Sequence, residues 1–340
     1  MNIEERTDAL VALGKQIVRG DDPCLEEAIH RARVENPWFS EANIRLAIQA
    51  IAEEFLQEEK LASLVKAYHL DDHIRQRHVG LILAGNIPMV GFHDVLCTFI
   101  TGHVALIKYA EKDRALIHCL LQMLGKIVPE TIAYFKEVEK LKNYDAAIAT
   151  GSNQTSVHFE WYFRHVPHII RRNRNSVAVL MGSETKEELV ALGKDIFSYF
   201  GLGCRNVSML LVPEGYTISS LFDNLQAYSE VIHHNKYKNN FDYNLALFLL
   251  NKEPFLHNDF FILKESDSLL SRIGVVHWHE YKNIDKASDY IQQRRDSIQC
   301  VVCASELPGI KTVRFGHAQS PGIRDFADDT DTIQFLLALP

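Results

Sequence analysis

The sequence predicts an α/β protein with about two domains. Its 340 residues exceed a typical single domain of about 150 residues. The composition, 47% hydrophobic and 24% charged, is that of a globular chain. From Val79 almost to the end, apolar runs of strand length alternate with amphipathic helical stretches. This alternation is typical of βαβ units, which build parallel sheets.

The first 75 residues predict helices. Ile44, Ile48, Ile51 and Phe55 recur at helical spacing, and the pattern continues after a polar interruption at 57–60. We therefore expect a helical segment before the first strand.

Four strands are predicted next, with helices between them at 90–100, 114–126 and 157–164. We expect these strands to form one parallel sheet. They are 79–84, 104–108, 146–150 and 177–180.

A second α/β unit follows. A predicted helix at 186–200 leads through a glycine-rich turn into a strand at 207–212. Further strands are predicted at 260–263, 275–278 and 299–304, with a helix at 284–294. The expected domains are 1–181 and 182–310, and the segment 311–340 is expected either to return to the first domain or to lie at an oligomer interface.

Charge and cysteine content exclude several classes of protein. With 36 Lys and Arg against 44 Asp and Glu, the net charge of −8 offers no broad cationic face, so nucleic acid is not an expected partner. The start of the chain carries acids at Glu4 and Glu5, and no apolar run approaches about 18 residues, so we expect a cytoplasmic protein without a transmembrane segment. Six dispersed cysteines form no disulfide framework, and a reducing compartment keeps them as thiols.

Cys204 is the candidate nucleophile. It lies in the turn between the predicted helix and strand of the second unit, after Gly201 and Gly203, which let the backbone approach a substrate closely. The neighbouring Arg205 favours a thiolate. Taken alone, Cys204 fits a buried structural cysteine better, because free cysteines are among the most buried residues.

Polar residues follow two of the predicted parallel strands, where ligands commonly bind. Asn86 comes after the first strand, and its amide suits an oxyanion, although a turn before Pro88 is the commoner use of such a residue. Lys108 and Glu111 end the second strand, where they either bind a ligand or are solvated charges.

The third strand ends at Thr150, Gly151 and Ser152, just before a predicted helix. Helix N-termini bind phosphate through unpaired N–H groups, but a plain serine N-cap also fits. The chain contains no GxGxxG, GxxxxGK[ST] or GxSxG motif.

In this order, the four segments resemble the landmarks of the aldehyde dehydrogenase superfamily: an Asn-x-Pro strand end, a Lys-Pro-x-Glu strand end, a Thr-Gly-Ser turn and a Gly-x-Cys loop. The best likeness within it is to the LuxC-type acyl-CoA reductases, the fatty acid reductases of bacterial luminescence. The segments that carry it are Gly85–Pro88, Ala149–Asn153, 170–180 and Arg314–Gly316.

The resemblance implies an aldehyde dehydrogenase-like fold, with a Rossmann-like cofactor domain and an α/β catalytic domain. It implies a covalent thioester on Cys204, with Asn86 as an oxyanion donor. Lys108 and Glu111 are then expected to bind the adenosine ribose. The residues expected to approach the cofactor pyrophosphate are Thr150, Gly151 and Ser152.

The implied cofactor is NADPH, with NADH left open because a carboxylate at Glu111 suits free ribose hydroxyls. No metal is expected. Cys300 and Cys303 have redox-motif spacing, but they lie in a predicted strand and are interpreted as structural. His277 and His279 lack a third ligand at a recognisable spacing.

One departure from the family pattern points to the direction of the reaction. Ordinary aldehyde dehydrogenases carry a glutamate near the segment aligned with 170–172, where it activates water, whereas residues 168–182 contain no Asp or Glu. This absence favours reduction of a fatty acyl thioester, from acyl-CoA or an acyl-protein, to an aldehyde. The alternatives are an acyl transferase or thioesterase that uses Cys204 without reduction, and a non-catalytic nucleotide-binding scaffold. The resemblance also implies self-association.

Overall fold

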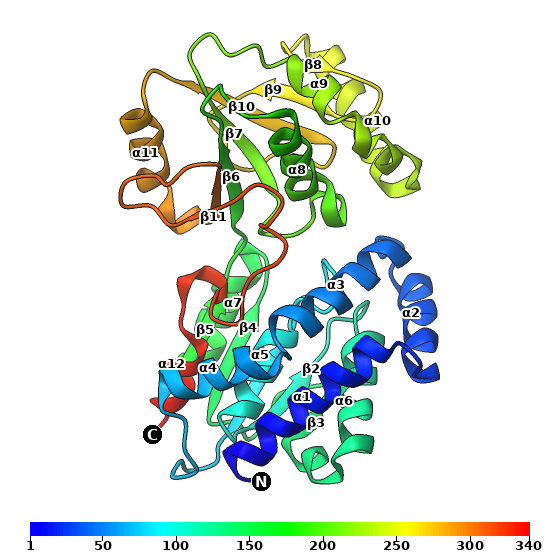
Figure 1. Cartoon of the computed structure of the whole chain (residues 1–340), viewed down its shortest axis with the longest axis vertical. Coiled ribbons are helices and arrows are strands. Elements are labelled where there is room, and N and C mark those ends of the chain that lie inside the picture. The colour runs from blue at the N-terminus through cyan, green and yellow to red at the C-terminus, as the bar shows by residue number, and fades with distance from the viewer. The chain divides into compact units, whose positions relative to one another are not determined.

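The computed structural model describes residues 1–340, which form two compact units (Figure 1). The first unit comprises Met1–Asn173 together with Pro321–Pro340, and the second comprises Arg174–Ser320. The chain therefore leaves the first unit after Asn173, where the sequence suggested 181. Of the C-terminal segment, 311–320 belongs to the second unit and only the remainder returns to the first.

The first unit contains a five-stranded sheet in the order β3-β2-β1-β4-β5. All neighbouring strands are parallel. Ile82 pairs in register with Lys108 of β2 and with Ala149 of β4, so the carboxyl ends of these three strands share one edge. The strands are β1 (His78–Ile82), β2 (Val104–Lys108), β3 (Phe135–Glu137), β4 (Ala146–Thr150) and β5 (His168–Arg171).

Helices make up the beginning of the first unit, as predicted. The first helix starts with a capping box in which Asn2 and Glu5 each accept the other's backbone N–H. The helices of this unit are α1 (Ile3–Arg19), α2 (Pro23–Glu35), α3 (Glu41–Glu54), α4 (Glu58–Tyr68), α5 (Phe92–Ile100), α6 (Ala115–Ile127), α7 (Asn153–Phe163) and α12 (Thr332–Leu337), with 3-10 turns η1 (Pro129–Tyr134) and η5 (Ala327–Asp329).

The C-terminal residues are fixed to the first unit by side-chain hydrogen bonds. Tyr68 donates its hydroxyl to Asp331 at 2.6 Å. The buried ring of His103 bonds the carbonyl of Leu336 at 3.1 Å, and burial lowers the pKa of His103, which favours the neutral ring. These two hydrogen bonds attach the C-terminal residues to the first unit.

The prediction that 177–180 joins the first sheet was wrong. This segment is β6 (Asn175–Val179), which lies between β11 and β7 in the second sheet. The place beside β4 is taken by β5 (His168–Arg171), a short strand with polar residues at both ends and therefore without a continuous apolar run. Three residues, 172–174, carry the chain from one sheet to the other.

The second unit contains a seven-stranded sheet in the order β12-β11-β6-β7-β10-β9-β8. Its neighbouring strands are parallel except for β8 and β9, which are antiparallel. Besides β6, the strands are β7 (Val207–Pro213), β8 (Leu256–His257), β9 (Ile262–Glu265), β10 (Val275–Tyr281), β11 (Ile298–Cys303) and β12 (Thr312–Val313).

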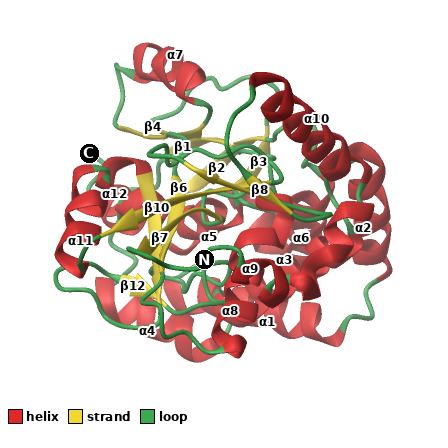
Figure 2. Cartoon of the chain, turned by 90° about the horizontal axis from the view of Figure 1, so that it is seen from above, coloured by secondary structure: helices red, strands yellow, loops and turns green.

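The helices of the second unit pack outside its strands, and the same α/β layering is seen in the first unit (Figure 2). Apolar side chains of α8, β7 and β9 form one large core cluster. The helices are α8 (Lys186–Phe197), α9 (Ser220–Asn224), α10 (Asn235–Asn251) and α11 (Ile284–Gln293), with 3-10 turns η2 (Ser198–Gly201), η3 (Gln226–His233) and η4 (Arg295–Ser297).

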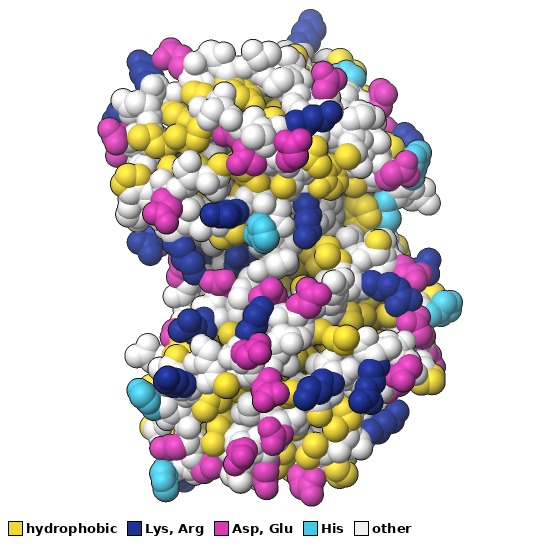
Figure 3. Space-filling view, viewed as in Figure 1, with side chains coloured by type: hydrophobic (Ala, Val, Ile, Leu, Met, Phe, Trp, Pro, Cys, Tyr) yellow, Lys and Arg dark blue, Asp and Glu magenta, His cyan; other side chains and the backbone are white.

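No helix combines the length and the apolar character needed to cross a membrane. On the face drawn in Figure 3, acidic and basic side chains are interspersed, without a large patch of one sign.

Candidate functional site

The predicted site residues fall into two groups, one in each unit. Asn86, Lys108, Glu111 and 150–152 follow the carboxyl ends of β1, β2 and β4, which share one edge of the first sheet. Cys204 lies in the second unit, in the loop before β7. The structure thus brings the predicted cofactor residues and Asn86 to one sheet edge.

Asn86 is exposed on a loop that leaves β1. The preceding Gly85 fits closely against the loop after β2, because a Cβ at this position would lie 2.6 Å from the Cβ of Ala110. The Gly85 carbonyl accepts a hydrogen bond from the buried amide of Asn36 at 3.3 Å. The backbone beside Asn86 is therefore fixed by packing and by a hydrogen bond.

The side chain of Asp113 supports the same loop through a hydrogen bond. The sequence did not predict this role. The carboxylate of Asp113 accepts the backbone N–H of Met89 at 3.0 Å, and Met89 has a left-handed φ of 55°. Burial raises the pKa of Asp113 to about 7, although the bond from Met89 opposes the rise. The second oxygen, Oδ1, is buried without a hydrogen-bond partner.

The loop after β2 presents two exposed charges. Lys108 ends the strand, and Glu111 follows three residues later. Close by, Glu137 accepts hydrogen bonds from the hydroxyl of Tyr109 at 3.2 Å and from Arg114 at 2.7 Å. Glu137 is thus occupied by neighbouring donors, whereas Lys108 and Glu111 extend from the sheet edge.

Ser152 is the N-cap of α7, which was the structural alternative to phosphate binding at this position. Its hydroxyl accepts the backbone N–H of Thr155 at 3.2 Å. Gly151 is tightly packed, since a Cβ would lie 3.0 Å from the ring of Phe159 and 3.1 Å from the Cβ of Thr155. A strand end with a glycine before a helix N-terminus fits a pyrophosphate group, and the cap does not exclude that use.

The loop that carries Cys204 begins with an unusual backbone. The predicted helix 186–200 is shorter than expected, because α8 ends at Phe197 and Tyr199, Phe200 and Gly201 all adopt left-handed φ values of 52°, 58° and 76°. Such conformations cost about 1 to 3 kcal/mol at each non-glycine residue. Cys204 itself is half-buried after this turn. The strained turn must therefore be held in place by the surrounding structure.

Asn206 provides much of that support. Its buried side chain accepts the N–H of Gly203 at 2.8 Å. Its amide nitrogen lies 2.7 to 3.2 Å from three carbonyls at the end of α8, those of Asp195, Ile196 and Ser198. One side chain thus ties the end of the helix to the Cys204 loop.

Asp195 and Arg205 fix the same region to a later segment. Asp195 is completely buried and accepts the N–H groups of Gly316 at 2.6 Å and Ala318 at 2.9 Å. Burial raises the pKa of Asp195 to about 6, against the effect of these two bonds. Arg205 donates its Nε to the carbonyl of Ala318 at 2.6 Å, which fixes the guanidinium to the same later segment.

Ser176 of β6 holds the backbone of Cys204. Its hydroxyl donates to the Cys204 carbonyl at 3.0 Å and accepts the N–H of Cys300 at 3.2 Å. Cys300 and Cys303 both lie in β11, so their predicted place in a strand is confirmed. Burial raises the pKa of Cys303, which favours its unreactive thiol form.

Residues 168–182, which contain no Asp or Glu, begin with β5, and the last residue of this strand is the buried cation Arg171. Arg171 forms an ion pair with Asp94 and donates to the hydroxyl of Thr332 at 2.9 Å. The next residue, Arg172, pairs with Glu160 at 3.3 Å. Asp94 and Glu160, the two carboxylates paired at this strand end, are therefore bound to arginines.

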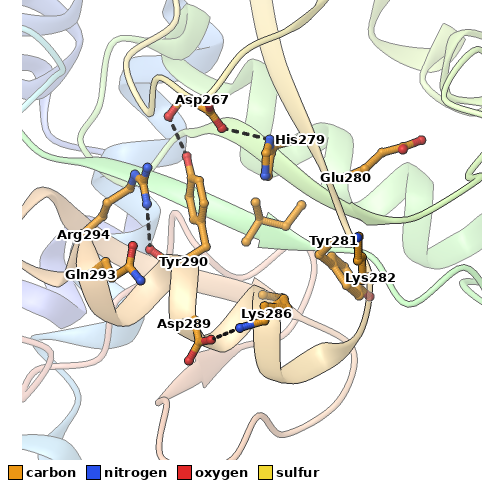
Figure 4. A pocket seen from close by; sticks show the side chains of 12 residues that line it. Asp267, His279, Glu280, Tyr281, Lys282, Lys286, Asp289, Tyr290, Gln293 and Arg294 are labelled. Carbon is orange, nitrogen blue, oxygen red and sulfur yellow. Dashed lines mark hydrogen bonds and ion pairs between the residues drawn. The ribbon is translucent and has the colours of Figure 1, made fainter.

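A separate pocket of about 360 Å³ lies between β10 and α11 of the second unit (Figure 4). The ring of Tyr290 stands between His279, at a centroid distance of 5.4 Å, and Arg294, whose Cζ lies 3.9 Å from the ring centre. Asp267 pairs with His279 at 3.0 Å. None of the predicted site residues lines this pocket, and its groups bond mainly to one another.

Sequence reasoning missed four supporting side chains: Asp113, Asp195, Asn206 and Ser176. Asp195 left a visible signal, because it lies among Leu192 and Ile196 on the apolar side of a predicted helix, where an acid needs buried partners. Ser176 and Asp113 left none, because their roles depend on tertiary contacts.

No protein-family model and no curated protein matches the chain in sequence. Solved structures do match. Aldehyde dehydrogenase 21 from Physcomitrella patens, in complex with succinate, has a TM-score of 0.71 at 11% identity, over 99% of this chain and 84% of its own. NADP-dependent glyceraldehyde-3-phosphate dehydrogenase from Bacillus halodurans has 0.64 at 14%, over 89% and 74%.

Propionaldehyde dehydrogenase from Rhodopseudomonas palustris, with bound propionyl-CoA, has a TM-score of 0.63 at 11% identity, over 89% of this chain and 76% of its own. These similar structures are aldehyde dehydrogenases. The chain therefore has an aldehyde dehydrogenase-like fold, which confirms the predicted fold class.

Proposed function

We propose that this protein is an NAD(P)H-dependent reductase of acyl thioesters, which converts a fatty acyl-CoA or an acyl-protein to an aldehyde through a thioester on Cys204. The observation that carries the proposal is the rigid, strained loop that holds a half-buried thiol in an aldehyde dehydrogenase-like fold. A thiol that only fills a core needs no such support.

The proposed reaction has two halves. The Cys204 thiolate attacks the acyl carbonyl, and the carbon–sulfur bond to coenzyme A breaks with release of its thiolate. The side-chain amide of Asn86 and the backbone N–H of Cys204 donate to the oxyanion. The acyl group on Cys204 then needs a hydride at its thioester carbon, which a reduced nicotinamide would supply when bound; collapse of the resulting thiohemiacetal would give the aldehyde and restore the Cys204 thiolate.

The lack of an acid in residues 168–182 supports reduction rather than hydrolysis. Release of an acid requires an activated water, and two carboxylates near this strand end, Asp94 and Glu160, are paired with Arg171 and Arg172. Reduction requires no such base, because the leaving thiol departs readily at neutral pH. The propionyl-CoA bound to the Rhodopseudomonas neighbour is consistent with a thioester substrate in this fold.

Cofactor binding is proposed at the edge of the first sheet. Gly151 and Ser152 approach the pyrophosphate at the start of α7, with Thr150 beside them, while Lys108 and Glu111 bind the ribose. We propose NADPH, consistent with the NADP complex of the Bacillus neighbour. Glu111 argues for NADH, because its carboxylate would repel a 2′-phosphate. Both nucleotides therefore belong in any assay.

Intact mass spectrometry tests the covalent step. Wild-type protein mixed with a long-chain acyl-CoA and no cofactor is expected to gain one acyl group, which Cys204→Ala prevents and Cys300→Ala leaves in place. Addition of NADPH or NADH is then expected to remove the adduct and to release an aldehyde that a hydrazine reagent traps.

The other outcomes distinguish the alternatives. Acylation that is discharged only to water or to another thiol identifies a thioesterase or acyl transferase. Absence of any adduct on Cys204 with every acyl donor contradicts the proposal and leaves the nucleotide-binding scaffold.

A further inference from the structure

We propose that Asp113 is a positioning residue for Asn86: its carboxylate holds the loop Gly85–Met89 in the conformation that presents the Asn86 amide. This inference rests on the proposed function, because it assigns Asp113 a part in the oxyanion role given to Asn86. It goes beyond that function by linking Asn86 to the neighbouring loop that carries the proposed ribose contacts.

The first observation is the backbone of Met89. This residue is not a glycine, yet its φ is 55°, in the region that side chains disfavour. Its N–H donates to Asp113 Oδ2 at 3.0 Å, and both residues are buried. The hydrogen bond therefore offsets the strain of the conformation at the end of the loop.

The second observation is the fit at the other end of the loop. A Cβ at Gly85 would lie 2.6 Å from the Cβ of Ala110 and 3.1 Å from the Cβ of Asp113. The Gly85 carbonyl also accepts the amide of Asn36 at 3.3 Å. Both ends of the loop are thus fixed, and Asn86 is exposed between them.

The third observation is that the acceptor for the Met89 N–H is a buried carboxylate, although burying a charge costs free energy. One oxygen atom is enough to accept the N–H of Met89, and an uncharged acceptor would avoid burying a charge. The second oxygen, Oδ1, is buried without a hydrogen-bond partner. What a carboxylate adds is a charge-assisted hydrogen bond, which is stronger than a neutral one.

The surroundings of Asp113 make its charge sensitive to pH near neutrality. Burial raises its pKa to about 7. The loop residues Gly85–Met89 that pack on it include no titratable side chain. On its own loop, the charge of Asp113 acts on the phenol of Tyr109, whose hydroxyl is bound to Glu137 and whose pKa is raised by burial and further by the charges of Glu137 and Asp113. Exposed Glu111, Lys112 and Arg114 flank it in sequence.

Asp113 also belongs to the loop that follows β2, which carries Lys108 and Glu111. A ribose bound by these two residues would therefore act on the same short segment that holds Met89. The structure joins the proposed ribose contacts and the proposed oxyanion donor in one packed unit.

Asp113→Asn tests the inference, because asparagine keeps the shape and one acceptor oxygen but is never charged. The charged fraction of a group with a pKa of about 7 rises from about one tenth at pH 6 to about nine tenths at pH 8. The ratio of wild-type to variant kcat is therefore expected to rise several-fold, up to about ninefold, over this interval. KM for acyl-CoA is expected to change little. Glu130→Gln, an exposed change of the same kind, should give a constant ratio.

Hydrogen exchange gives a readout that does not depend on activity. The peptide that covers the Gly85–Met89 loop is expected to exchange faster in Asp113→Asn than in the wild type at pH 8, while exchange elsewhere in the first unit is unchanged. Equal exchange of this peptide overturns the inference, and so does a ratio of kcat values that does not vary with pH. If the wild type consumes no cofactor, the proposed reaction is refuted. The exchange data then still test, independently of activity, whether Asp113 stabilises the Gly85–Met89 loop.

Discussion

Asp195→Asn is the substitution that tests how the Cys204 loop is held. Asparagine preserves the shape of the side chain and one acceptor for the N–H groups of Gly316 and Ala318, but it removes a buried charge. Since burial raises the pKa of Asp195 from 3.8 to about 6, the native carboxyl keeps its proton where the unfolded chain has lost it. The free energy of unfolding therefore falls as pH rises toward 6 and is level above it.

The size of the effect follows from the same pKa. A difference of about two units corresponds to about 3 kcal/mol over the whole interval, at about 1.4 kcal/mol for each pH unit. Between pH 5 and pH 7.5, the wild type should lose about 1.4 kcal/mol of stability through Asp195, because only the unit from 5 to 6 contributes. The variant lacks this loss, so its stability relative to the wild type rises by that amount.

Urea unfolding followed by tryptophan fluorescence measures this change in the second unit alone. Trp278 packs against the core of that unit and is its sole tryptophan, so Trp38→Phe and Trp161→Phe give a clean reporter. Glu187→Gln, an exposed change on the same helix, serves as the control. If the stability difference between the wild type and Asp195→Asn is the same at pH 5 and pH 7.5, the burial argument is refuted.

Three further substitutions have defined outcomes. Asn86→Ala should lower turnover by about 10² to 10³, as loss of one oxyanion donor does, without changing the melting temperature; near wild-type kcat would remove Asn86 from the mechanism. Asp94→Ala leaves Arg171 buried without its ion-pair partner and should cost about 3 to 5 kcal/mol in urea unfolding. Gly193→Ala places a Cβ 2.2 Å from the ring of Tyr228 and should cost about 1 to 3 kcal/mol, and an unchanged denaturation midpoint would contradict this close approach of Gly193 to Tyr228.

Much of the fold was predictable because local patterns decide it. The strands 104–108 and 146–150 match the structure to the residue, since each is an apolar run that ends in one polar residue. The helix that begins at Lys186 follows Thr185 and Glu188, which form a capping box. These signals lie within a few residues of one another, so the sequence displays them directly.

The partition of strands between the sheets was not predictable. Strands that follow closely in sequence usually lie in one sheet, and β5 and β6 are only three residues apart, yet they belong to different sheets. The helix end at Phe197 was also missed, because Tyr199 and Phe200 fit a helical apolar pattern while their backbone is left-handed. Tertiary contacts decide both features.

The candidate site was predictable in its exposed residues and not in its support. Asn86, Lys108 and Ser152 follow predicted strands, so parallel pairing was expected to bring them to one edge, and the structure does so. The buried carboxylates of Asp113 and Asp195 accept N–H groups of Met89 and Gly316, which lie far from them in the sequence. No local sequence pattern marks such partners.

The most direct test of the proposed function is the decrease in absorbance of NADPH, and separately of NADH, when wild-type protein and Cys204→Ala are mixed with long-chain acyl-CoA. The proposal predicts that at least one nucleotide is oxidised in proportion to the aldehyde formed, and that Cys204→Ala abolishes the reaction while Cys300→Ala retains it. Absence of oxidation with both nucleotides across a range of acyl chain lengths and an acyl-protein donor, or oxidation that persists in Cys204→Ala, would contradict it.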